Sequence, residues 1–277
     1  MYAPATWRLI LEPNPRPGAL NLAVDEAILR IVAEGEAPPT LRLYGWSPPV
    51  LTLGRGQPFA DADTAVLRRD GIAVLRRMTG GTAVLNRDEL TYAVAVRDDE
   101  PRLSGAIFES YRGISEALLS ALAQLGVTSA AASGRDTGER AARSSRSRRE
   151  RTPVCFEITS DYEVMVGARK LVGSSQMRVR HGILQHGSLP LTGDIGDIGQ
   201  YLTARPSPER IRSHAMSLRD ALGRVVTWEE AADAVLEGFR SRLNLRLVPS
   251  PLTPLERERM EQLVIEKYGS EAWTRRL

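Results

Sequence analysis

Residues 153–191 read PVCFEITSDYEVMVGARKLVGSSQMRVRHGILQHGSLPL and contain three of the predicted strands of the chain. Residues 161–166 and 169–174 are two runs typical of β-strands, and Gly167-Ala168 separates them. A Gly-X pair between two strands predicts a tight type II′ hairpin, which would place Lys170 opposite Met165. Residues 182–191 predict a further strand.

In the chain as a whole, predicted strands dominate the middle and predicted helices flank them. Strand patterns occupy residues 40–46, 49–54, 71–77 and 91–96, and helical patterns occupy residues 18–34, 61–70, a segment that Ser104 would cap, and most of the chain from 208 onward. Because strands and helices do not alternate regularly, we expect an α+β fold with a mixed, mostly antiparallel sheet flanked by helices.

The length predicts one catalytic domain over residues 1–277, with a core over about 18–250, a mobile basic loop at 134–151 and a helical C-terminal tail at 207–277. Hydrophobic residues make up 42% and charged residues 26%, as in ordinary globular proteins.

We find neither a run of eighteen apolar residues nor a signal-peptide pattern, so no membrane association is expected. A single cysteine cannot form an internal disulfide, which favours a cytoplasmic location.

Charge is nearly balanced, with a net value of +3 that does not predict nucleic-acid binding. Residues 134–151, GRDTGERAARSSRSRRER, concentrate arginine without apolar periodicity. Three interpretations stay open for this segment: a solvated surface insert, a loop that steers an acidic protein partner, or an RNA-binding segment. The absence of interleaved aromatic residues weakens the third.

Cys155 is the only cysteine, and Lys170 is one of only two lysines. A thiolate nucleophile beside an ammonium, which lowers the thiol pKa or stabilises an acyl oxygen, would form an acyl-transfer site. A solitary cysteine is also a common inert core residue, and a lysine a common surface residue. Their adjacency requires the chain before residue 160 to fold back toward the hairpin.

Other polar elements offer weaker signals. Residues 76–81, RRMTGG, place two glycines after a strand, where backbone groups can approach an acyl chain, a phosphate or an adenylate, or simply form a turn. His186 is either a strand-end hydrogen-bonding residue or a polar group of the acyl site. No histidines or cysteines show metal-ligand spacing, so no metal site is predicted, and the absence of GxSxG argues against a serine hydrolase.

Together these blocks make the chain resemble the biotin/lipoate protein ligase superfamily, and most closely its cysteine-type (LipM-type) octanoyltransferases. Five blocks in fixed order carry the resemblance: NLAVDEAIL at 21–29, LRLYGWSPPVLTLGRGQ at 41–57, RRMTGGTAVLNRDELTYAV at 76–94, CFEITSDYEVMVGARKLVGSSQMR at 155–178 and GILQHGSLPL at 182–191. The segment beginning LTPLERERM resembles the closing helix of the family.

The resemblance implies that Cys155 takes an octanoyl group from octanoyl-acyl carrier protein and passes it to a lysine of a lipoyl-accepting protein, such as the glycine-cleavage H protein. Lys170 corresponds to the family lysine that lowers the thiol pKa and orients the acyl carbonyl. The expected enzyme is a monomer that needs no cofactor, nucleic acid or membrane. The residues expected to bind the substrate are Arg76, Thr79, Gly80, Gly81, Gly173 and His186.

The sequence departs from the family at two positions. The family often has histidine where Asn86 stands, and glycine or arginine where Thr82 stands. Acyl-chain preference is therefore left open, and so are three alternatives to the octanoyltransferase: an ATP-dependent lipoate–protein ligase, an amidotransferase that moves lipoyl or octanoyl groups between proteins, and a non-catalytic acyl-protein binding module.

Overall fold

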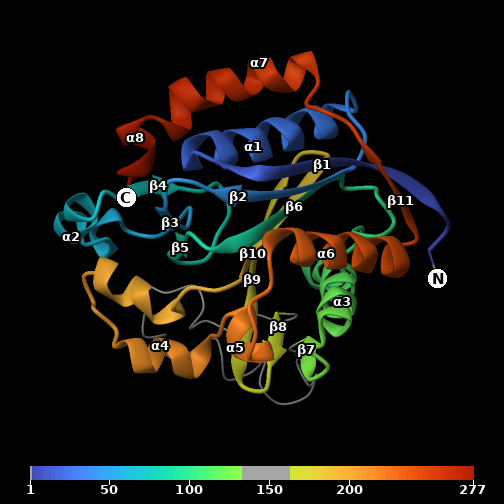
Figure 1. The fold of residues 1–277 in the computed structure, drawn as a ribbon. Helices are drawn as coiled ribbons and strands as arrows, with labels where there is room; N and C mark the ends of the chain where they lie inside the picture. Colours follow the sequence, from blue (N-terminus) through green and yellow to red (C-terminus); the bar gives the residue numbers. More distant parts are fainter. Residues whose placement is uncertain (1, 133–162) are drawn as a thin grey trace, which may run out of the picture.

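A computed structural model describes residues 2–132 and 163–277 and shows a central mixed sheet (Figure 1). Within these residues the sheet has eight strands, and only β11–β1 and β1–β2 are parallel pairs. The expected α+β class with a mostly antiparallel sheet is confirmed. In spatial order the strands are β11 (Leu245–Pro249), β1 (Ala5–Arg16), β2 (Thr40–Trp46), β6 (Glu89–Arg97), β10 (Gly182–Pro190), β9 (Arg169–Val179), β8 (Val164–Val166) and β7 (Ala130–Ala132).

A smaller sheet lies beside the β2–β6–β10 region. Its strand order is β4 (Ala73–Arg76), β3 (Val50–Leu53) and β5 (Val84–Asn86). The RRMTGG element therefore ends β4 and leads into β5, which places its glycines in the connection between two strands. The strand expected at 49–54 belongs to this second sheet and does not pair with β2.

Helices cover both faces of the main sheet (Figure 1). On one face, α1 (Gly18–Glu34) lies between the sheet and α7 (Pro254–Leu263). On the other, α3 (Ile107–Leu125) packs against α6 (Trp228–Leu243). The sheet thus separates two hydrophobic cores. The shorter helices and turns are η1 (Phe59–Asp61), α2 (Thr64–Arg69), η3 (Ile195–Tyr201), α4 (Pro208–His214), α5 (Leu218–Leu222), η4 (Val264–Tyr268) and α8 (Glu271–Thr274).

Two predictions made from glycine positions, the end of α1 and the register of the hairpin, are confirmed. Helix α1 ends at the expected Gly35, which adopts φ +84 and donates its N–H to Ile31 O and Val32 O. The hairpin also has the expected register, with Met165 opposite Lys170 and Gly167 at φ +59. The predicted Ser104 cap is wrong: α3 begins at Ile107, and Glu109 accepts from the backbone N–H of Ala106 at 2.8 Å.

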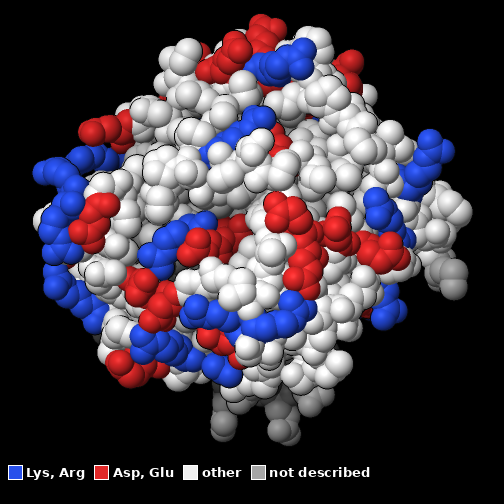
Figure 2. All heavy atoms as spheres, viewed as in Figure 1, with Lys and Arg blue, Asp and Glu red and all other residues white. Residues whose placement is uncertain are grey.

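The tail at 207–277 contains strand β11 in addition to helices, and β11 pairs in parallel with β1 at the other end of the chain. The predicted basic loop at 134–151 lies outside the described residues. Across the described ranges no helix has both the length and the apolar character needed to traverse a bilayer. Figure 2 shows basic and acidic side chains interleaved over this face, with basic groups along the edge where α2 lies.

Candidate active site

Lys170 lies at the start of β9, directly after the Gly167-Ala168 turn. Its side chain is 1% exposed, and its Nζ donates to Oε1 of the similarly buried Glu163 at 2.5 Å. An ammonium in the interior requires a countercharge, and Glu163 supplies it. The backbone carbonyl of Lys170 also accepts the N–H of Met216 at 3.0 Å, which fixes β9 against the chain after α4. Cys155, the predicted nucleophile, lies outside the described residues.

The two sheets enclose a cavity beside β9 and β10, which we call the central cavity. Apolar side chains from α1, β2 and β5 form part of its wall, and the rest consists of polar groups from β3, β5, β6, β9 and β10, Arg77 and two glycines. Its lining consists of Leu22, Tyr44, Trp46, Thr52, Arg77, Val84, Asn86, Glu89, Thr91, Gly173, Ser174, Ser175, His186, Gly187 and Ser188. Two predicted residues, Gly173 and His186, are therefore in this wall.

Thr79 joins the central cavity through His186. Thr79 Oγ1 lies 2.7 Å from His186 Nε2, and Ser175 Oγ donates to Thr79 Oγ1 at 2.8 Å. The other ring nitrogen of His186, Nδ1, lies 3.2 Å from Asp25 Oδ2. Because an ionised carboxylate only accepts, Nδ1 carries the proton and donates to Asp25, and the Thr79 hydroxyl is the partner of Nε2. The four side chains form one continuous chain of hydrogen bonds.

Asp25 anchors this chain of hydrogen bonds in the interior. Its carboxyl accepts from Arg42 Nη1 at 2.7 Å and from the Tyr44 hydroxyl at 2.8 Å, and Arg42 also pairs with Glu12. Burial alone would raise the pKa of Asp25, but the Arg42 guanidinium and the His186 hydrogen bond hold that pKa below its usual value. Asp25 is therefore ionised at neutral pH and orients the His186 ring.

Arg76, predicted to bind substrate, does not reach the central cavity. Its buried guanidinium donates Nη1 to the carbonyl oxygens of Gly54 at 2.8 Å and Gln57 at 2.5 Å. Nε and Nη2 both donate to Thr274 O, at 3.0 Å and 2.8 Å. Arg76 thereby joins the C-terminal helix α8 to the loop after β3.

Arg77, the next residue, lines the cavity instead. Its guanidinium donates to the carbonyl oxygens of Thr52, Gly80 and Thr82 at 3.2, 2.7 and 2.8 Å. These hydrogen bonds fix the turn that contains the predicted Gly80 and Gly81, both of which are exposed. Gly81 adopts φ +84, a conformation that favours glycine.

Sequence reasoning missed several residues of the cavity and its polar wall: Asp25, Glu89, Arg77 and Ser188. A usable signal existed for Asp25, because it interrupts the apolar stripe of the helix predicted at 18–34. An acid at a core position requires a buried partner. That partner, Arg42, is itself an interruption in a strand that is buried along its whole length.

Glu89 is a buried carboxyl in the cavity wall, and it forms no ion pair with any residue in the described ranges. Its Oε1 accepts from Asn86 Nδ2 at 2.9 Å and from the Thr91 hydroxyl at 2.6 Å. Burial raises the pKa of Glu89, and the polar groups around it offset only part of that effect. Asn86, a departure from the family pattern, is thus a direct partner of this carboxyl.

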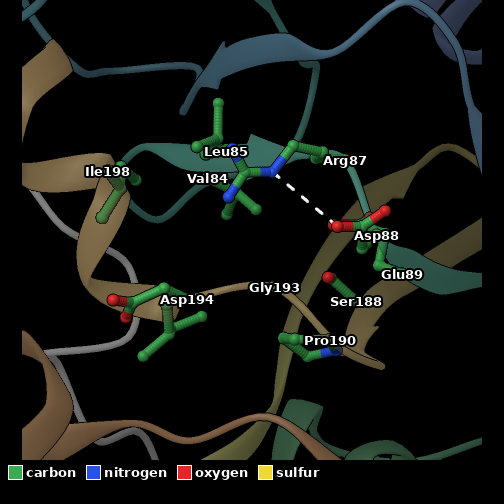
Figure 3. Close-up of a pocket in the computed structure, with 11 residues that line it drawn as sticks. Val84, Leu85, Arg87, Asp88, Glu89, Ser188, Pro190, Gly193, Asp194 and Ile198 are labelled. Atoms are coloured by element: carbon green, nitrogen blue, oxygen red, sulfur yellow. Dashed lines mark ion pairs between the residues drawn. The ribbon is translucent and has the colours of Figure 1, made fainter. Parts of the chain in front are cut away.

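A second cavity, which we call the lateral cavity, adjoins the central one (Figure 3). Val84, Glu89 and Ser188 line both cavities. In Figure 3, Arg87 and Asp88 lie across the lateral cavity from Asp194 and Ile198. The remaining lining residues are Leu85, Pro190, Gly193 and Ile195. No group of His, Cys, Asp and Glu side chains suited to a metal ion occurs in the described ranges.

Comparison with known proteins places the chain in a family. The family model for the lipoyl protein ligase A/B catalytic domain matches residues 17–240. The chain belongs to this family. A protein of Symbiobacterium thermophilum named Octanoyltransferase LipM is 40% identical, with 98% of each chain covered. Octanoyltransferase LipM of Kyrpidia tusciae is 42% identical over 98% of this chain and 99% of its own.

Solved structures share the fold of this family member. Lipoate-protein ligase A bound with ATP matches with a TM-score of 0.79 and 24% identity, covering 98% of this chain and 99% of its own. A bipartite lipoate protein ligase from Thermoplasma acidophilum, whose structural analysis includes its E2 lipoyl domain, matches with a TM-score of 0.76 and 22% identity over 99% and 97% of the two chains.

Proposed function

We propose that this chain transfers an octanoyl group from octanoyl-acyl carrier protein to a lysine of a lipoyl-accepting protein, such as the glycine-cleavage H protein. Cys155 carries the group as a thioester between the two steps. The observation that supports this most directly is the similarity, over nearly the whole chain, to two proteins named Octanoyltransferase LipM.

The central cavity supplies a place for the acyl chain. Leu22, Trp46 and Val84 offer apolar contact, and the chain of hydrogen bonds through His186 and Thr79 adds a fixed polar wall. Apolar pockets with a few placed polar groups are typical of sites for small acyl ligands. Gly173 leaves room in this wall, and Arg76 acts indirectly by holding the loop after β3.

Lys170 supplies positive charge to the reaction. A free thiol has a pKa of about 8.5, so only a small fraction is thiolate at neutral pH. An ammonium nearby lowers that pKa and stabilises charge on the acyl oxygen. The hydrogen bond to Glu163 fixes the orientation of the Lys170 ammonium. This limits where a thiolate or an acyl oxygen can lie to be stabilised by the ammonium.

The energetics of this reaction require no ATP. Exchange of one thioester for another is nearly isoenergetic, and conversion of a thioester to an amide is downhill. The two half-reactions can therefore be measured separately, with acyl-enzyme formation first and lysine acylation second.

The proposal is tested by incubating the protein with octanoyl-acyl carrier protein and measuring its intact mass. We expect a gain of one octanoyl group, its loss in Cys155→Ala, and transfer of the group to an added lipoyl-accepting protein. Modification of that acceptor only with ATP and free acid, without an acyl-enzyme, would instead identify a lipoate–protein ligase. An acyl-enzyme that forms only from an acylated lipoyl protein would identify an amidotransferase.

A further inference from the structure

We propose that the lateral cavity admits the acceptor lysine and that Glu89 takes a proton from its ammonium as the amine attacks the thioester. This inference rests on the proposed function, because it assigns a place and a proton acceptor to the second half-reaction. It concerns residues to which neither the sequence analysis nor the Lys170–Glu163 pair assigns a role.

The position of the lateral cavity suits a second substrate. It shares Val84, Glu89 and Ser188 with the central cavity, so a group that enters it meets the wall of the acyl site. Glu89 and Ser188 come from neighbouring antiparallel strands, β6 and β10, whose pairing fixes their separation. A group held here would contact the same residues as an acyl group in the central cavity.

The charge around the lateral cavity favours a cation. Three carboxyl groups line it, those of Asp88, Glu89 and Asp194, together with the guanidinium of Arg87. Arg87 Nε lies 4.0 Å from Asp88 Oδ2, and Arg212 pairs with Asp194. Glu89 has no ion pair within the described ranges, and its carboxylate would attract an ammonium and repel the phosphates of a nucleotide.

A buried hydroxyl lies beside Glu89 at the same place. Ser188 is 6% exposed, and its Oγ lies close enough to the Glu89 carboxyl to lower its pKa, although the contact lacks standard hydrogen-bond geometry. Glu89 accepts from Asn86 and Thr91 on Oε1, at 2.9 Å and 2.6 Å. An ammonium carries three N–H donors, so it can satisfy both the Ser188 hydroxyl and the Glu89 carboxylate.

The walls fit the rest of a lysine side chain. Val84, Leu85, Pro190, Ile195 and Ile198 are apolar and lie along the cavity (Figure 3). A lysine has an apolar stem of four methylene groups and a charged end, and such a side chain buries its stem while its nitrogen seeks polar partners. The cavity combines these apolar walls with the buried carboxyl of Glu89, which matches the chemistry of a lysine side chain.

Two protons leave the lysine nitrogen in the proposed step. The Glu89 carboxylate takes one proton from the ammonium, and the neutral amine nitrogen forms a bond to the thioester carbon. The second proton leaves the nitrogen as the carbon–sulfur bond breaks, and it goes to the departing Cys155 sulfur. The products are an amide, the free thiol and protonated Glu89, which then releases its proton to water. The raised pKa of Glu89 makes its carboxylate a stronger proton acceptor than an exposed one.

The decisive experiment starts from isolated octanoyl-enzyme of the wild type and of Glu89→Gln, and follows one turnover. With a lipoyl-accepting protein at pH 7, we expect transfer to slow about 100-fold in Glu89→Gln. With hydroxylamine, which is already neutral at pH 7, we expect both proteins to react at similar rates. The deficit with lysine should shrink as the pH approaches the lysine pKa of about 10.4, because the amine then needs no base. Glu237→Gln, an exposed change on α6, is the matched control.

A second variant tests the passage itself. A Cβ on Gly193 would lie 3.3 Å from Asp88 Oδ2, so Gly193→Leu projects into the mouth of the lateral cavity. We expect a KM for the acceptor protein at least about tenfold higher, with hydroxylamine release unaffected. Gly56→Leu, at an exposed glycine whose Cβ would meet no atom within 4 Å, is the control.

Three results would overturn the inference. Equal slowing with lysine and hydroxylamine in Glu89→Gln would make Glu89 a residue that only shapes the acyl site. Normal lysine transfer in that variant would remove it from the reaction. Gly193→Leu could instead slow acyl-enzyme formation from the carrier protein and leave the KM for the acceptor normal. The lateral cavity would then bind the donor and not the acceptor lysine. Failure of the wild type to form any acyl-enzyme would instead refute the proposed function, and this inference with it.

Discussion

Thr79 and His186 are 107 residues apart in sequence, yet Thr79 Oγ1 and His186 Nε2 lie 2.7 Å from each other. One comes from the connection between β4 and β5 in the small sheet, and the other from β10 in the main sheet. Their hydrogen bond therefore joins the two sheets beside the central cavity. Any change that breaks it alters both the stability of this junction and the shape of the central cavity.

Thr79→Val is expected to lower both activity and stability. The variant keeps the volume of the side chain but leaves His186 Nε2 and the Ser175 hydroxyl without their partner. An unsatisfied buried polar group costs about 1–3 kcal/mol, which urea unfolding would measure. We also expect acyl-enzyme formation to slow about tenfold, because the ring is no longer held at both nitrogens. Thr79→Ser, which keeps the hydroxyl, should recover most of both losses; equal behaviour of the two variants would contradict this explanation.

Lys170→Ala is expected to lose acyl transfer while the fold, checked by far-UV circular dichroism, is retained. Removing one member of a buried ion pair costs about 3–5 kcal/mol, because the Glu163 carboxylate loses the ammonium 2.5 Å away. Lys170→Met combined with Glu163→Leu should regain much of that stability without regaining transfer. A transfer rate in Lys170→Ala within a few-fold of the wild type would exclude Lys170 from the mechanism.

The elements that the sequence predicts best are those with local signals. Gly35 ends α1, and the Gly167-Ala168 turn sets the register that places Lys170 opposite Met165. Strand β1 escaped prediction although it spans Ala5–Arg16, because its buried and exposed residues do not alternate regularly. Strand β11 was not predicted either, since β1, its partner among the described residues, lies more than 200 residues earlier.

In the candidate site, too, some residues could be predicted from the sequence, and others depend on contacts between distant segments. The family resemblance predicted Thr79, Gly173 and His186 as site residues, and the structure brings them to one cavity or to its hydrogen-bonded wall. It named Arg76, whereas Arg77 lines the cavity, because only tertiary structure shows which guanidinium faces it. Glu89 could not be singled out either, since its significance comes from burial and from a cavity formed with residues about 100 positions later.

Arg76→Lys is expected to destabilise the protein by about 2–3 kcal/mol, because a single ammonium cannot replace a fork that reaches carbonyl groups on two segments. The substitution removes the paired donation from Nε and Nη2 to Thr274 O, which holds α8. Urea unfolding would measure the change. Arg69→Lys, at an exposed residue paired with Asp70, should stay within about 0.5 kcal/mol of the wild type. Similar losses of stability in both variants would mean that Arg76 has no special structural role.

Glu89→Gln is expected to make the protein more stable than the wild type at neutral pH, although it slows the proposed transfer. Burial raises the pKa of Glu89 in the folded state, whereas the unfolded carboxyl titrates near about 4.3. Above that pH the unfolded chain ionises more readily than the folded one, so the wild type loses stability as the pH rises through the folded pKa. Glutamine carries no charge, and its Oε1 can still accept from Asn86 and Thr91.

The difference should therefore depend on pH in a defined direction. Thermal unfolding of the two proteins would give a higher Tm for Glu89→Gln at pH 7 to 8, and the two Tm values would converge below about pH 4, where the carboxyl is protonated in both states. Because the comparison is between two proteins that differ at one residue, the other titrating groups contribute equally to both. A variant that is less stable than the wild type at pH 7 and more stable at acidic pH would show that the Glu89 carboxylate stabilises the native state, and would remove the physical basis for its role as a proton acceptor.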